Sequence, residues 1–165
     1  MKAVCAVLAA TLLLSACVLH AKSPLLGDAD ATLLLGSTNL TLTAVTASRA
    51  MPSQLSLVPE GRHYRVSNPG PGGPTDLYFA ALPDGRYAMQ YGVGQGSDYA
   101  VATWDGARLA ISPLDCARLK TDLRSNPLVQ FVNNACALRG DGRPLDDLAV
   151  LAQTTAAPAV VLQRN

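Results

Sequence analysis

Residues 77–112 read LYFAALPDGRYAMQYGVGQGSDYAVATWDGARLAIS, and this stretch decides the fold. It contains four short apolar runs that are separated by turn sequences. Pro83-Asp84-Gly85 and Asp105-Gly106 are typical of tight turns, because proline fixes φ and glycine allows positive φ. Strict alternation predicts one buried face in the second run, formed by Tyr87, Met89, Tyr91 and Val93. The stretch therefore predicts an antiparallel meander of four strands.

Further strand-like runs lie on both sides of this meander. They are residues 32–35, 39–45, 54–58, 63–66, 128–132, 136–138 and 159–162. In residues 39–45, apolar Leu40 and Leu42 alternate with Thr41 and Thr43, which predicts that the threonines face outward.

Two helices are predicted in the C-terminal third. The first begins at Ser112 and Pro113, since serine caps a helix and proline suits its first position, and it ends near residue 125. The second covers about residues 144–154, with an apolar stripe formed by Leu145, Leu148, Ala149 and Ala152. The predicted fold class is α+β: an antiparallel β-meander with two short helices in the C-terminal third and one disulfide.

The amino end has the composition of an export signal. Lys2 precedes an uncharged, mostly apolar run of 12 residues, 3–14, and then Ser15-Ala16-Cys17. A membrane span needs about 20 apolar residues, so the run fits a signal core better. Leu14-Ser15-Ala16-Cys17 resembles the lipobox of bacterial lipoproteins. The resemblance implies that Cys17 carries a diacylglycerol on its thiol and an acyl chain such as palmitate on its new amino end. An ordinary secretory signal that contains a cysteine is the alternative.

The resemblance also implies the organisation of the chain. Residues 1–16 are a lipoprotein signal peptide, residues 17–31 are the acylated cysteine and a flexible tether, and residues 32–165 form a single small α+β domain. In bacterial lipoproteins, Asp after the cysteine often means retention in the inner membrane. Val18 occupies this position, so we expect a lipid-anchored protein of the bacterial cell envelope, in the outer membrane and facing the periplasm.

The cysteine count indicates one disulfide. Cys5 leaves with the signal and Cys17 takes the lipid, so Cys116 and Cys136 remain. Two remaining cysteines in an oxidising compartment usually pair, and closing a loop of this size contributes about 3 kcal/mol in the chain-entropy model. A reactive thiol is the alternative, but the sequence contains no Cys-x-x-Cys motif.

Composition and motifs exclude several classes of function. Without Lys2 the acidic and basic residues are equal in number, so no basic stripe for nucleic acid is expected. The glycines of residues 92–96 precede a β-like run instead of the helix that a dinucleotide site needs, so no cofactor is expected. Asp146 and Asp147 are neighbours on a helix and diverge, so no metal is expected.

The function predicted from the sequence is a membrane-anchored, non-catalytic binding or structural module that holds an envelope protein partner. Aromatic residues along the meander either form an interface or fill the core: Tyr78, Tyr87, Tyr91, Tyr99 and Trp104. One alternative is a binder of an apolar small ligand in a curled sheet. Another is a cell-envelope hydrolase that uses His63 and Glu60. No catalytic residue is assigned, because no nucleophile elbow is present.

Overall fold

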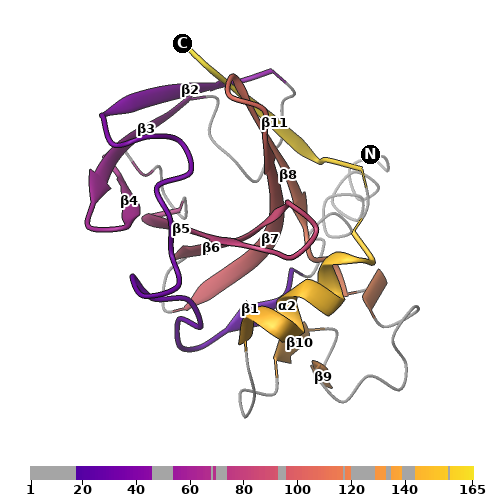
Figure 1. The fold of residues 1–165 in the computed structure, drawn as a ribbon. Helices are drawn as coiled ribbons and strands as arrows, with labels where there is room; N and C mark the ends of the chain where they lie inside the picture. The colour runs from indigo at the N-terminus through magenta and orange to yellow at the C-terminus, as the bar shows by residue number, and fades with distance from the viewer. Residues whose placement is uncertain are drawn as a thin grey trace, which may run out of the picture.

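The computed structural model describes residues 18–45, 54–67, 69, 74–92, 96–116, 118–119, 129–132, 135–138, 144–155 and 157–165. Nine of its strands form one antiparallel sheet in the order β1-β7-β6-β5-β4-β3-β2-β11-β8. β7 also pairs with β8, so the eight strands from β2 to β8 together with β11 close into a barrel, while β1 is added beside β7 (Figure 1). The strands of this sheet are β1 (His20–Ala21), β2 (Leu40–Ala44), β3 (Gln54–Glu60), β4 (His63–Val66), β5 (Asp76–Ala81), β6 (Tyr87–Gly92), β7 (Ser97–Trp104), β8 (Arg108–Pro113) and β11 (Val160–Arg164).

The α+β prediction is wrong, because the described part of the chain is mostly β: a closed eight-stranded antiparallel barrel, with α2 (Pro144–Ala152) as the one short helix among the described elements. Ser112 and Pro113, predicted to begin the first helix, end β8, where Ser112 pairs with Val101. Leu114 and Asp115 are not helical either, and helical backbone in this region is described only at Cys116, Arg118 and Leu119. The remaining residues of that predicted helix lie outside the described residues. Pairing with a neighbouring strand outweighs the local capping signal at this point.

The four-stranded meander is confirmed as β5 to β8, with each strand paired to the next. Its turns include Gly85 with φ of 81° and Gly106 with φ of 97°, the left-handed conformation that glycine adopts at no steric cost. The last strand closes the barrel, since β11 pairs with β8 on one side and with β2 on the other.

The barrel interior is filled by the side chains of its own strands. Alternate residues of every barrel strand point inward, as the period of two requires. We call the buried ones, together with Leu35, the interior cluster. Its members are Leu35, Leu40, Leu42, Leu55, Leu57, Tyr64, Val66, Leu77, Phe79, Met89, Ala100, Ala102, Leu109, Ile111, Val160 and Leu162.

The outer face of β5, β6 and β7 is also buried. This face packs against α2, against Leu19 and Leu26, and against the ribbon formed by β9 (Val129–Val132) and β10 (Ala135–Leu138) (Figure 1). We call the buried residues of this second group the outer cluster. Members of this cluster include Leu19, Leu26, Ala88, Tyr99, Val101, Leu148 and Leu151. Strands β5 to β7 are therefore covered on both faces, while β2 and β3 expose their outer side chains.

The disulfide between Cys116 and Cys136 is present and buried within the outer cluster. It joins the segment after β8 to β10, and thereby fixes the ribbon to the barrel. No helix in the part of the chain that the structure describes is long and apolar enough to cross a membrane.

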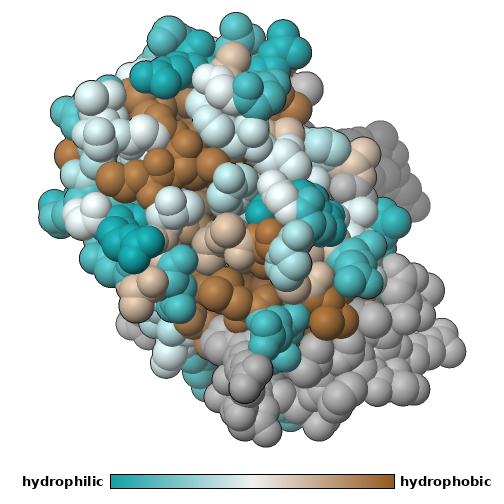
Figure 2. Space-filling view, in the orientation of Figure 1, coloured by the Kyte–Doolittle hydropathy of each residue, from teal (hydrophilic) through white to brown (hydrophobic). Residues whose placement is uncertain are grey.

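Residues 18–36, which we call the N-terminal strap, lie against the barrel. The sequence predicts a tether over residues 17–31 and a strand over 32–35, yet Leu19, Leu26 and Ala31 are buried and 32–35 form no strand. Leu35 packs in the interior cluster. The face of the molecule seen in Figure 2 carries hydrophobic patches among hydrophilic residues. Cys17 lies outside the described residues.

Candidate functional site

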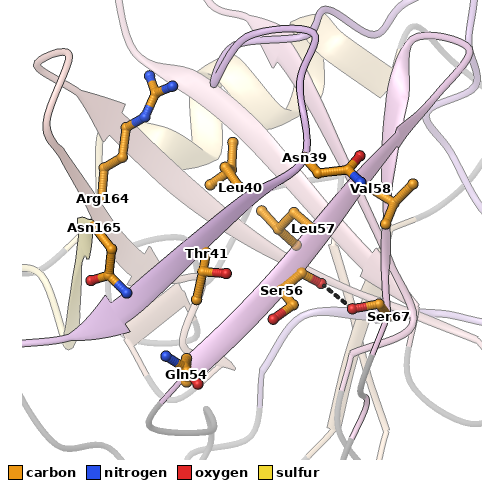
Figure 3. A pocket seen from close by; sticks show the side chains of 10 residues that line it. All are labelled: Asn39, Leu40, Thr41, Gln54, Ser56, Leu57, Val58, Ser67, Arg164 and Asn165. Carbon is orange, nitrogen blue, oxygen red and sulfur yellow. Dashed lines mark hydrogen bonds between the residues drawn. The ribbon is translucent and has the colours of Figure 1, made fainter.

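The candidate site is a groove lined by residues of β2 and β3 and by the end of β11 (Figure 3). Its volume is about 500 Å³. Amides, hydroxyls and one guanidinium dominate the side chains that line it. These residues are Asn39, Leu40, Thr41, Gln54, Ser56, Leu57, Val58, Ser67, Arg164 and Asn165.

Strand alternation positions the polar groups of the groove. Leu40, Leu42, Leu55 and Leu57 point into the barrel, so the residues between them face outward. Thr41 and Ser56 are direct partners across the two strands, which places their hydroxyls side by side. The alternation in residues 39–45 predicted the outward position of Thr41, and the structure confirms it.

Two neighbouring segments complete the rim of the groove. Ser67 donates from its backbone nitrogen to the Ser56 carbonyl at 2.9 Å and from its hydroxyl to the same oxygen at 3.2 Å. At the other end, the backbone nitrogen of Asn165 donates to the Thr41 carbonyl at 3.3 Å, and the Thr43 hydroxyl donates to the Asn165 side chain at 2.9 Å. The carboxyl-terminal residues are thereby held against β2.

Arg164 is the one charged side chain among the ten that line the groove. Leu162 points into the barrel, so Arg164, two residues later, projects on the same side of β11. Burial raises the pKa of Tyr64, and the Arg164 charge opposes that rise. The groove therefore offers hydrogen-bond donors and acceptors together with one positive charge. Such a lining suits a hydroxyl-rich ligand that carries an acidic group.

His63, a candidate base in the hydrolase hypothesis, joins the strap to the barrel. Its Nδ1 lies 2.8 Å from the Asp28 Oδ1, and its ring stacks on Tyr78 with centroids 4.5 Å apart. Glu60 faces the other ring nitrogen at 3.9 Å and also pairs with Arg65. Burial raises the pKa of Tyr78, and the nearby carboxylates raise it further.

A second histidine pair joins the strap to the barrel. The Nδ1 of His20 lies 2.7 Å from the Asp98 Oδ1, with β1 and β7 paired in the same register. Gly96 permits this approach, because a Cβ there would lie 2.4 Å from a carbon of the His20 ring. Within the described residues, no serine or cysteine hydrogen-bonds to either histidine ring, so neither pair has the geometry of an activated nucleophile.

The sequence did not predict the buried, hydrogen-bonded polar groups of Gln90 and Tyr99 beneath the strap. The Oε1 of Gln90 accepts from the backbone nitrogens of Leu25 and Leu26, both at 2.8 Å, and from the Tyr99 hydroxyl at 2.8 Å. Its Nε2 donates to the Leu26 carbonyl at 3.0 Å. Burial raises the pKa of Tyr99 to about 12. The sequence signal for this anchor was a glutamine inside an otherwise apolar strand run.

The aromatic residues of the meander fill space in the core. Tyr99 is fully buried, and Tyr87, Tyr91 and Trp104 pack against the interior cluster. Burial raises the pKa of Tyr91, in keeping with this position. Core packing accounts for Tyr99, whereas Tyr78, Tyr87, Tyr91 and Trp104 are only partly buried.

Asp146 and Asp147 occupy the first turn of α2, where the helix dipole favours negative charge. Across the described residues, no group of three or more histidine, cysteine, aspartate or glutamate side chains is arranged to hold a metal ion. Residues 92–96, whose glycines were compared with a dinucleotide site, are followed by strand β7. Comparison with protein-family models, with curated proteins and with solved structures gave no match for this chain.

Proposed function

We propose that the chain is an envelope lipoprotein, anchored in the membrane through Cys17, whose barrel is a non-catalytic binding module. The lipobox-like residues 14–17 support the anchor, and a buried disulfide suits an oxidising compartment. Val18 supports placement in the outer membrane, facing the periplasm. A closed barrel is compatible with a ligand-binding module.

The observation that carries the binding role is the contrast between the filled interior and the polar groove. An eight-stranded barrel is just wide enough to be filled by side chains or to hold one small ligand, and here Tyr64, Phe79 and Met89 are among the side chains that fill it. An apolar ligand inside the sheet therefore has no support. Recognition takes place on the groove, which binds a saccharide that carries an acidic group or a similar hydroxyl-rich component of the envelope.

A cell-envelope hydrolase is the weaker candidate. The His63 and His20 rings are both engaged by aspartates that fix the strap. Both histidines therefore have a structural role, which is to attach the strap to the barrel.

Intact mass and amino-terminal sequencing of the protein from its native envelope test the anchor. We expect a chain that begins at Cys17 with added acyl mass, and an unprocessed, unacylated C17S variant. A native chain with another amino end, or without acyl mass, contradicts the proposal.

Amide chemical-shift titration of the lipidated protein in nanodiscs tests the groove. Glucuronic acid should shift the amides of β2 and β3 more than glucose does, because Arg164 pairs with the carboxylate. R164Q should abolish this difference, while R65Q, which changes an exposed arginine outside the groove lining, should retain it. Equal shifts for both sugars in the unmodified protein, or no shifts in β2 and β3, refute this site.

A further inference from the structure

The strap leaves no spacer between the proposed lipid and the folded barrel. Val18 forms a bridge with Asp115, and the backbone nitrogen of Leu19 donates to the Leu114 carbonyl at 2.8 Å. Leu19 is completely buried, and its carbonyl accepts from the Tyr99 nitrogen at 3.1 Å. Consecutive Cα atoms are about 3.8 Å apart, so a lipid on the residue before Val18 would be attached one residue from this paired segment.

The surroundings of Val18 are fixed from two directions. β1 pairs with β7 on one side and lies against β10 on the other. The disulfide joins Cys116, the residue after Asp115, to Cys136 in β10. We call this part of the surface, formed by Val18, Asp115, β1 and β10, the base of the domain.

The groove lies on the opposite side of the barrel from the base. In the closed order of eight strands, β3 is the fourth strand from β7 in either direction. Figure 1 shows the same arrangement, with β2 and β3 at the top and β1, β9, β10 and α2 at the bottom. With strands about 4.8 Å apart and tilted by about 40°, the barrel is roughly 15 Å across.

We propose that the barrel rests on the bilayer with its base against the lipid headgroups and presents the groove away from the membrane. This inference depends on the proposed acylation of Cys17. A flexible tether allows every face of a domain to approach the bilayer, whereas a lipid attached beside a buried residue of a paired segment allows essentially one. The anchor therefore sets the direction in which the groove faces.

Paramagnetic broadening by lipids that carry a chelated gadolinium ion tests the orientation, with the lipidated full chain in nanodiscs. The effect falls with the sixth power of distance. Amides of Val18, Asp115 and β10 should lose most of their intensity, while those of Thr41 and Ser56 should keep theirs. The control variant carries 20 Gly and Ser residues inserted after Cys17, a linker that reaches roughly 25 Å and should make the broadening even.

Two contrary results are distinguishable. An intact mass without acyl groups refutes the anchor and this inference together. A correct acyl mass with equal broadening of base and groove in the unmodified chain, or with stronger broadening at Thr41 and Ser56, refutes the orientation alone and leaves the proposed function standing.

Discussion

Replacing Gln90 with leucine tests how the strap is attached. The Gln90 side chain is 1% exposed and makes four hydrogen bonds, three of them to the backbone of Leu25 and Leu26. Leucine has a similar volume but no polar atoms. The Leu25 nitrogen retains the Tyr99 hydroxyl at 3.0 Å as an acceptor. That hydroxyl loses Gln90 but retains Ser97 as a side-chain partner, whereas the nitrogen and the carbonyl of Leu26 lose their side-chain partner.

A buried polar group left without a partner costs about 1–3 kcal/mol, so two such groups predict that Q90L lowers the free energy of unfolding by about 2–6 kcal/mol. Urea denaturation measures this change. Hydrogen exchange should show faster exchange at the Leu26 amide, since the strap opens first.

Gln163 is the matched control, because it is exposed in β11. We expect Q163L to change the free energy of unfolding by less than about 0.5 kcal/mol. A loss of less than about 1 kcal/mol in Q90L, with unchanged exchange at Leu26, would refute the view that Gln90 holds the strap.

Three further outcomes are expected. Replacing both Cys116 and Cys136 with alanine should lower the free energy of unfolding by about 3 kcal/mol, measured by urea denaturation, and an unchanged midpoint would contradict the structural role. G96A should cost about 1–3 kcal/mol because the new Cβ meets the strap histidine, whereas G27A, which meets nothing within 4 Å, should not; equal effects on the thermal midpoint would count against this contact. Because burial raises the pKa of the Tyr99 phenol from 10.0 to about 12, the unfolded chain loses this proton first, so stability is full below pH 10 and falls as the pH rises to 12. Ultraviolet titration of the folded protein should show a phenol that ionises late, and ionisation of every tyrosine near the ordinary pKa would contradict this reasoning.

Local signals in the sequence predicted the strands and turns of the meander well. Pro83-Asp84-Gly85 and Asp105-Gly106 specify their turns through their own backbone preferences, so no distant contact is needed to read them. The outward position of Thr41 followed in the same way from the period of the strand.

Neither the closure of the barrel nor the docking of the strap could be predicted from local sequence patterns. β11 pairs with β2 although Leu162 and its partner Ala44 are 118 residues apart, and nothing within residues 159–162 identifies that partner. The sequence around Leu19 and Leu26 has no periodic apolar pattern, because each of these residues is buried by tertiary contacts and not as part of a regular element. The groove depends on the same long-range pairing, which places Arg164 opposite Leu42 and brings Asn165 against Thr41.

The position of β11 has a consequence for how the protein is made. A ribosome delivers the chain from its amino end, and the strand that joins β2 to β8 comes last. Until it arrives, β2 and β8 each lack a partner and the sheet stays open. Contacts so distant in sequence form slowly, since a long loop must first be ordered. The barrel therefore closes only after the last strand has been synthesised, however early the local meander of β5 to β8 forms.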